Sequence, residues 1–158
     1  MNRPVTESNT IDDMSDNSQI RSLAAVPNLR YRNLSAAIGF LAEAFGLEAT
    51  FIATGKPGQV VHAQLRAGST MIYLSPDVAD DRYGMHSPLA LNGTNQCLCL
   101  VIAGDVDEHA THAEHAGAEL INPPHDTDFG GREYSCRDPE GHVWTIGTYA
   151  GEPEAVVA

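Results

Sequence analysis

Apolar and polar positions follow one another along the chain in an order of elements that occurs twice. In the first copy, apolar residues at strand spacing flank a stretch at helical spacing, which Asn33 can cap and Gly46 can end. A turn at 56–58 and a hairpin around 67–69 separate the later strands. The predicted elements are a strand at 26–33, a helix from 34, and strands at 47–53, 60–65 and 70–74.

The same order returns after a polar linker at 76–95. Asp105 can cap the second helix and Gly117 can end it. We expect Pro123-Pro124 to break the strand that follows, because proline cannot donate to a strand ladder. The predicted elements of this copy are a strand at 97–103, a helix from 106, a short strand at 118–121 and two final strands within 126–149.

The two final strands are joined by a tight turn at Asp138-Pro139-Glu140-Gly141, with proline and glycine at positions that favour a turn. Three landmarks recur at a separation of roughly 72 residues, which indicates an internal repeat: Asn33 and Asp105, Gly46 and Gly117, Gly68 and Gly141. The pattern predicts an α+β fold of paired β-α-β-β-β repeats that form a curved half-barrel sheet with a concave cleft. Such a cleft is the default place for a ligand.

These boundaries predict one domain at 23–150 between two polar tails at 1–22 and 151–158. Repeat one covers about 25–75, the linker 76–95, and repeat two about 96–149. The N-terminal tail has no apolar segment of a secretory signal, and no apolar run approaches the roughly 18 residues that span a membrane. We therefore expect a cytoplasmic protein that does not contact membranes.

The charge of the chain restricts its partners. Nine Lys and Arg residues stand against 21 Asp and Glu residues, for a net charge of −12. Such a chain repels phosphate backbones, which excludes nucleic acid as an expected partner. The acidic residues favour a cationic small molecule, or they serve solubility alone.

The cysteine content argues against a disulfide framework. The chain has three cysteines, Cys97, Cys99 and Cys136, and no CxxC pair, which excludes a zinc ribbon. Cys97 and Cys99 are two residues apart in an apolar run, so their side chains share one face of a strand. We expect all three to be buried thiols in a reducing compartment.

Four segments resemble the vicinal oxygen chelate superfamily, which includes glyoxalases, bleomycin-resistance proteins and extradiol dioxygenases. The resemblance covers roughly residues 26–149. It also implies a homodimer, consistent with the exposed edges that such half-barrels leave. The segments are LRYRNLSAAIGFLAEAFGLEA, VVHAQLRAGSTMIYLS, VIAGDVDEHATHAEHAGAEL and GGREYSCRDPEGHVWTIGTY.

Enzymes of this superfamily place His, Gln or Glu metal ligands at four positions, and the resemblance carries these to Val26, Tyr73, Leu98 and Thr145. Where a relative would read DPDGxxxEL, this chain reads DPEGHVWTI, with Thr145 in place of the glutamate. Aliphatic side chains cannot bind a divalent metal, and neutral hydroxyls are poor ligands. The resemblance therefore predicts a subgroup without the usual metal and without another cofactor.

Several side chains are candidates for lining the cleft. His62 could act as a general base or be a structural histidine. Glu133 could bind a cation, take a proton, or pair with Arg132 or Arg137. Only one of Glu133 and Tyr134 can face the cleft, and Trp144 is expected in the core. The predicted ligand-binding set is Asn28, Arg30, Tyr73, Glu133, Tyr134 and Thr145, and the catalytic candidates are His62 and Glu133.

His109, His112 and His115 lie on one helix and could bind metal together with Glu108, or form a solvated flank.

Two functions fit these features. The first is a metal-independent small-molecule-binding protein of the bleomycin-resistance type, which sequesters a cationic or amphipathic ligand in the cleft. The second is a glyoxalase-like lyase or isomerase that uses non-standard metal ligands or a His or Glu base. A third hypothesis is an accessory domain that binds a partner through its tails.

Overall fold

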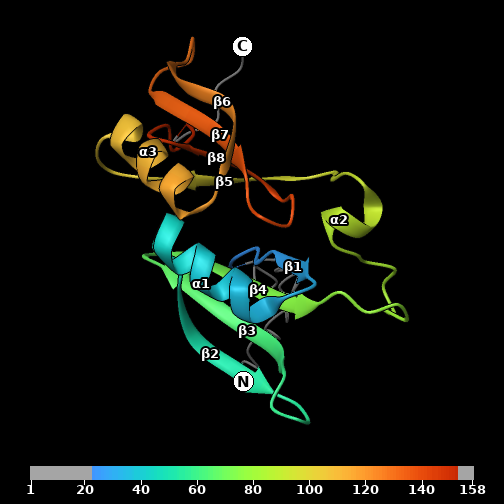
Figure 1. Cartoon of the computed structure of the whole chain (residues 1–158). Coiled ribbons are helices and arrows are strands. Elements are labelled where there is room, and N and C mark those ends of the chain that lie inside the picture. The colour runs from blue at the N-terminus through green and yellow to red at the C-terminus, as the bar shows by residue number, and fades with distance from the viewer. Residues whose placement is uncertain (1–22, 153–158) are drawn as a thin grey trace, which may run out of the picture.

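The structure, a computed structural model, describes residues 23–152, so the tail segments 1–22 and 153–158 lie outside the described residues. The elements follow the predicted order, with one additional short helix in the linker (Figure 1). They are β1 (Asn28–Tyr31), α1 (Leu34–Phe45), β2 (Glu48–Thr54), β3 (Val60–Ala67), β4 (Thr70–Pro76), α2 (Pro88–Leu91), β5 (Cys97–Val101), α3 (Val106–Ala116), β6 (Glu119–Asp126), β7 (Arg132–Arg137) and β8 (Val143–Gly147).

Each repeat forms a four-stranded sheet with one helix against it. The strand orders are β1-β4-β3-β2 and β5-β8-β7-β6, so the two repeats have the same topology. In each sheet the first strand runs parallel to the last, and the other pairs are antiparallel. The α+β class and the duplicated unit are confirmed. Between the described strands, no hydrogen-bonded ladder joins one sheet to the other.

The ends of both long helices follow from single residues. The side chain of Asn33 accepts a hydrogen bond from the backbone N–H of Ala36 at 3.0 Å, which satisfies one of the free donors of α1. Asp105 accepts from two backbone N–H groups in the first turn of α3. Gly46 and Gly117 end the helices with φ of 67° and 113°, which a residue with a Cβ rarely adopts.

One face of each sheet packs against its helix and forms the core. In the first sheet the buried residues alternate along β3 and β4, namely Ala63, Leu65, Ile72 and Leu74. In the second sheet they alternate along β7 and β8, namely Tyr134, Cys136, Trp144 and Ile146. The core position predicted for Trp144 is confirmed. Because strand side chains alternate between faces, the opposite face of each sheet carries no helix and is open.

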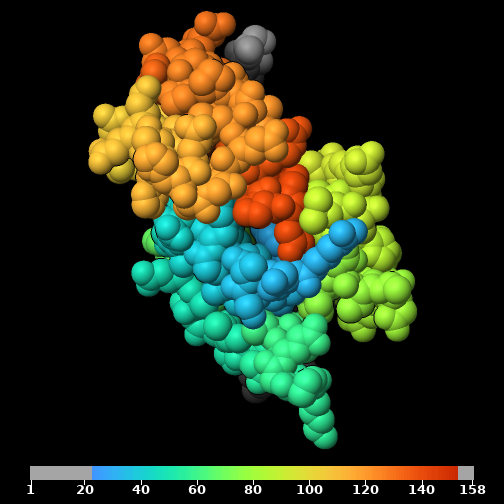
Figure 2. Space-filling model, viewed as in Figure 1, coloured from blue at the N-terminus to red at the C-terminus, as the bar shows by residue number. Residues whose placement is uncertain are grey.

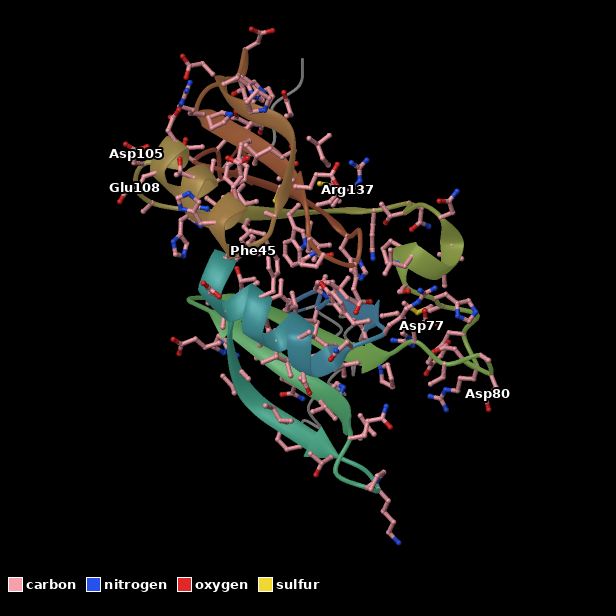
Figure 3. The ribbon with its side chains drawn as sticks, in the orientation of Figure 1. Phe45, Asp77, Asp80, Asp105, Glu108 and Arg137 are labelled. Atoms are coloured by element: carbon pink, nitrogen blue, oxygen red, sulfur yellow. The ribbon has the colours of Figure 1, made fainter. Side chains whose placement is uncertain are left out.

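The two repeats meet where α1 and β1 contact the second repeat (Figure 2). Phe45 projects from the end of α1 toward the second repeat and lies 5.0 Å from the Trp144 ring, between ring centroids (Figure 3). The predicted 138–141 turn is confirmed by the hydrogen bond from the N–H of Gly141 to the carbonyl of Asp138, at 2.9 Å. The Glu140 carboxylate of this turn accepts hydrogen bonds from the backbone N–H groups that lead into α1.

One prediction about local structure was wrong. β6 continues through Pro123-Pro124 to Asp126 instead of ending at 121. It is an edge strand with two register shifts, and at such a position a missing N–H breaks no ladder bond. The predicted linker contains α2, a single turn at Pro88–Leu91 that Ser87 caps. No helix in the described range 23–152 has the length and apolar character needed to cross a membrane.

Candidate functional site

The open face of the first sheet carries an aromatic group. His62 on β3 and Tyr73 on β4 are half-buried and lie edge to face, with ring centroids 5.4 Å apart. Phe51 on β2 extends this group, 6.4 Å from the His62 ring, and 52% of its surface is exposed. Within the described residues His62 has no carboxylate partner to orient its imidazole. This face offers stacking surface more than acid–base chemistry.

The open face of the second sheet carries thiols, hydroxyls and one carboxylate. The Thr145 hydroxyl lies 2.9 Å from the Ser135 hydroxyl and 3.2 Å from the Cys97 sulfur. Cys99 is directly opposite Thr145 in the β5–β8 register. Burial raises the pKa of the Cys99 thiol, and the neighbouring Cys97 thiol and the Glu133 carboxylate raise it further. These residues form a continuous polar strip across the sheet.

A cavity of about 360 Å³ opens on this second face. Glu133, Thr145 and Cys99 are among the residues that line it, and Phe129 and Tyr149 stand at its edge with ring centroids 4.9 Å apart. Its volume falls within the range of small-molecule sites, about 300–1,000 Å³. It therefore combines an aromatic edge with a carboxylate, a combination suited to a cation that also has an apolar part.

The Glu133 carboxylate pairs with neither of the arginines considered as partners. Arg132 binds Asp107 and Asp126, and Arg137 lies 3.8 Å from Glu119. The ionic neighbour of Glu133 is instead His125, whose Nε2 is 3.6 Å from a carboxylate oxygen. A histidine carries charge only when protonated, so Glu133 has no permanent cation beside it within the described part of the chain.

Three residues of the predicted ligand-binding set do not present a free side chain to the open faces. Tyr134 lies in the core, because it points toward α3 and its hydroxyl is 2.8 Å from Nδ1 of His109. Arg30 is only 5% exposed and forms an ion pair with Asp81 at 2.8 Å, so its positive charge is already paired. The third such residue, Asn28, is half-buried and accepts a hydrogen bond from Ser75.

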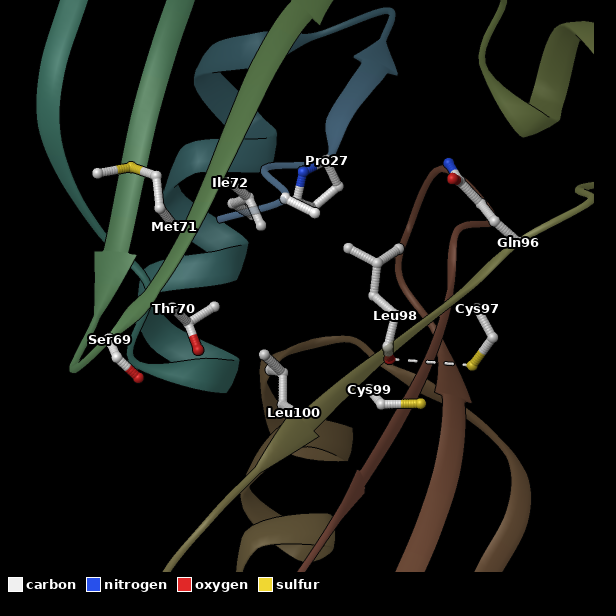
Figure 4. Close-up of a pocket in the computed structure, with 11 residues that line it drawn as sticks. Pro27, Ser69, Thr70, Met71, Ile72, Gln96, Cys97, Leu98, Cys99 and Leu100 are labelled. Atoms are coloured by element: carbon white, nitrogen blue, oxygen red, sulfur yellow. Dashed lines mark hydrogen bonds between the residues drawn. The ribbon is translucent and has the colours of Figure 1, made fainter. Parts of the chain in front are cut away.

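The positions that hold metal in relatives do not form a divalent metal site here. Leu98 pairs with Trp144 and points to the opposite side of β5 from the cysteines (Figure 4). The side chain beside Thr145 is therefore Cys97 and not Leu98. In residues 23–152, no three His, Cys, Asp or Glu side chains come together as a metal-binding group. The donors present therefore do not fit the usual metal of the superfamily.

The three helical histidines have separate environments. The ring of His109 is near Tyr134, and burial lowers its pKa, with a smaller contribution from His112. Nε2 of His112 lies 2.7 Å from the carbonyl oxygen of Glu43, which links α3 to α1. His115 faces solvent in the last turn. His109 and His112 therefore connect parts of the fold, and the three histidines do not converge on one metal site.

The expectation of three buried thiols was wrong for two of them. Cys136 is fully buried, whereas Cys97 and Cys99 are exposed on the open face. The alternation of the segment Cys-Leu-Cys-Leu was the available signal, since it placed the leucines and cysteines on opposite sides. A second cavity, of about 370 Å³, lies on the leucine side, where Leu98 and Leu100 face Ile72 of the first repeat (Figure 4).

Comparisons with known proteins agree with this architecture. An uncharacterized protein of Mycobacterium bovis, Mb0911c, is 31% identical over 125 residues, which is 78% of this chain and 82% of that protein. The crystal structure of TioX from Micromonospora sp. ML1 has a TM-score of 0.59 and 26% identity, and the match covers 78% of this chain and 97% of TioX.

A further structure is described as a glyoxalase/bleomycin resistance protein/dioxygenase family enzyme from Burkholderia phytofirmans PsJN. It has a TM-score of 0.61 at 23% identity, with coverage of 76% of this chain and 93% of that one, and this likeness concerns the fold alone. The family model of the same superfamily matches residues 22–146. The chain belongs to the Glyoxalase/Bleomycin resistance protein/Dioxygenase superfamily.

Proposed function

We propose that this chain is a metal-independent small-molecule-binding protein of the bleomycin-resistance type, and that it holds a cationic or amphipathic ligand on the open face of its second repeat. The observation that carries the proposal is the Glu133 carboxylate in an aromatic-edged cavity, where, among residues 23–152, a histidine is its only ionic neighbour. A ligand cation would bind beside Glu133, where no arginine or lysine of the described part of the chain forms an ion pair with it.

Charge and shape support the same kind of ligand. The net charge of −12 draws cations toward the protein, and this attraction raises association rates at low salt. At the edge of the cavity, Phe129 and Tyr149 offer ring faces to the apolar part of a ligand or to the cation itself. Thr145 and Ser135 add hydroxyl groups that can donate or accept hydrogen bonds.

A second copy of the chain is the proposed partner. Each repeat leaves one sheet face without a helix, and on the first sheet this face exposes Phe51, 52% accessible, beside His62 and Tyr73. A homodimer in the cytoplasm would cover part of these faces and close the cavity from a second side. Native mass spectrometry tests this arrangement, and a monomer at micromolar concentration would remove it.

A glyoxalase-like lyase or isomerase is the second candidate. The observation in its favour is the Glu133–His125 pair at 3.6 Å, which could move a proton between a carboxylate and an imidazole. Turnover that is lost in His125→Gln and Glu133→Gln would favour the enzyme. Ligand binding without any turnover would favour the binding protein.

The test of the binding proposal is the Glu133→Gln variant, measured with a panel of cationic aromatic compounds that includes bleomycin. A ligand at 100 times its dissociation constant stabilises the protein by about 2.7 kcal/mol, so a thermal shift finds the binders. Loss of a charged hydrogen bond, worth about 1.5–3 kcal/mol, should then weaken binding roughly ten- to hundredfold in calorimetry.

The matched control is Glu114→Gln, which makes the same charge change on the exposed side of α3, away from the cavity. It should leave the affinity unchanged. Equal affinity of Glu133→Gln and the original protein, or equally tight binding of a neutral analogue, would contradict the proposal.

A further inference from the structure

Two exposed thiols stand side by side on β5. Cys97 and Cys99 are exposed, while Cys136 is fully buried. They are two residues apart in a strand, and both side chains lie on the side of β5 away from Leu98 and Leu100 (Figure 4). The binding proposal uses Cys99 only as part of a cavity wall and does not use Cys97. The proposed function therefore gives no role to this pair of thiols.

We propose that Cys97 and Cys99 together bind one soft, thiophilic metal ion of the copper(I) type in two-coordinate geometry. Thiolates select copper(I) over harder cations. A tetrahedral zinc site needs four ligands, or three and a water. Within residues 23–152 no third His, Asp or Glu joins the two thiols to form such a group. The donor count thus selects an ion that is satisfied by two sulfurs.

The geometry of the strand favours a bound ion over a disulfide between Cys97 and Cys99. In an extended strand the two Cα atoms are about 6.6 Å apart, from a rise of about 3.3 Å per residue. That separation is at the upper end of the disulfide range of about 4.4–6.8 Å, so a disulfide here would be strained.

Binding of copper(I) releases protons from the two thiols. Each thiol loses its proton as its sulfur binds the ion, so one copper(I) ion displaces two protons and no electron is transferred. The Thr145 hydroxyl, 3.2 Å from the Cys97 sulfur, can donate a hydrogen bond to the resulting thiolate. The net charge of −12 adds a general attraction for the cation.

The first measurement counts accessible thiols with Ellman's reagent. Two thiols should react in the native protein and a third only after unfolding, because Cys136 is enclosed and its pKa is raised to about 12 by burial. Copper(I) is then titrated under nitrogen against a coloured copper(I) chelator. The expected result is about one ion per chain, bound far more tightly than zinc(II).

The variants Cys97→Ser and Cys99→Ser make small changes at exposed positions, so the fold should persist and circular dichroism can verify it. Each should weaken copper(I) binding at least about a hundredfold, and Thr145→Val about 10- to 100-fold, as for an outer-shell partner. Glu133→Gln keeps both thiols and should still bind about one copper(I) ion per chain even if it loses the organic ligand, so the two proposals can fail separately.

Copper(I) binding by the Cys97→Ser/Cys99→Ser double variant that equals the original protein would overturn the inference. So would a mass two units lower in air, which indicates a disulfide, with no copper bound after reduction. Zinc(II) binding tighter than copper(I) would also overturn it.

Discussion

The substitution Asp138→Asn tests how the two repeats are held together. Asp138 is 3% exposed, and its carboxylate accepts four hydrogen bonds. One oxygen accepts from the Tyr31 hydroxyl at 2.6 Å and the Trp144 indole N–H at 3.1 Å. The other accepts from the backbone N–H groups of Glu140 and His142, both at 3.0 Å. Tyr31 belongs to the first repeat, so this carboxylate joins the repeats.

Asparagine keeps one oxygen for the two backbone donors but directs its NH2 group at the other two. The Tyr31 hydroxyl can rotate away, yet both it and the Trp144 N–H lose their acceptor while buried. A buried donor without a partner costs about 1–3 kcal/mol, so two of them cost about 2–6 kcal/mol. We expect about 4 kcal/mol, a large part of the roughly 5–15 kcal/mol stability of a domain.

Urea unfolding followed by fluorescence measures this loss directly, because Trp144 is the only tryptophan of the chain and lies at the junction. Tyr31→Phe is the control, since it removes one donor without leaving it unpaired and should cost about 1 kcal/mol. In the double variant the effect of Asp138→Asn should be smaller. A loss below about 1 kcal/mol for Asp138→Asn alone would refute the assigned hydrogen bonding.

Two further predictions concern stability. Gly147→Ala should destabilise by about 1–3 kcal/mol, because the new Cβ would lie 2.8 Å from the Glu133 Cβ, whereas Gly39→Ala has open space at an exposed position of α1 and should stabilise by about 0.5–1 kcal/mol. Equal urea midpoints for the two would contradict this. Stability should also fall as the pH drops below about 6.5, because burial lowers the pKa of His109 in the folded chain and the unfolded chain binds the proton more tightly. His109→Gln should reduce the dependence of the free energy of unfolding on pH, measured by urea titrations at several pH values. An unchanged dependence would show that other groups cause it.

The fold was predictable where local residues decide it. Asn33 and Asp105 form helix caps through their own side chains, and glycines at the helix ends adopt the positive φ that other residues avoid. Pro123-Pro124 alone could not show whether β6 ends or continues there, because proline is excluded from a central strand and tolerated in an edge strand. Strand order, and hence which strand is an edge, depends on the packing of the whole repeat.

The residues of the candidate site could be predicted only in part, because the direction of a strand side chain also depends on how the elements pack. Strand alternation separates Glu133 from Tyr134, but it does not say which of them faces the helix. The packing of α3 decides that, and it buries Tyr134. The loss of Arg30 as a free cation depends on Asp81, 51 residues away in the linker. Such a long-range pair leaves no pattern in a single sequence.

The most recognisable segment of the chain, the Asp138–Gly141 turn, serves to join the repeats. Its two carboxylates bind Tyr31 and the backbone before α1, and neither is on an open face. Open-face residues such as Glu133 alternate with core residues along the same strands, so they can change while the core stays packed. The fold and the ligand are therefore specified by different positions, and the ligand must be sought on the open faces.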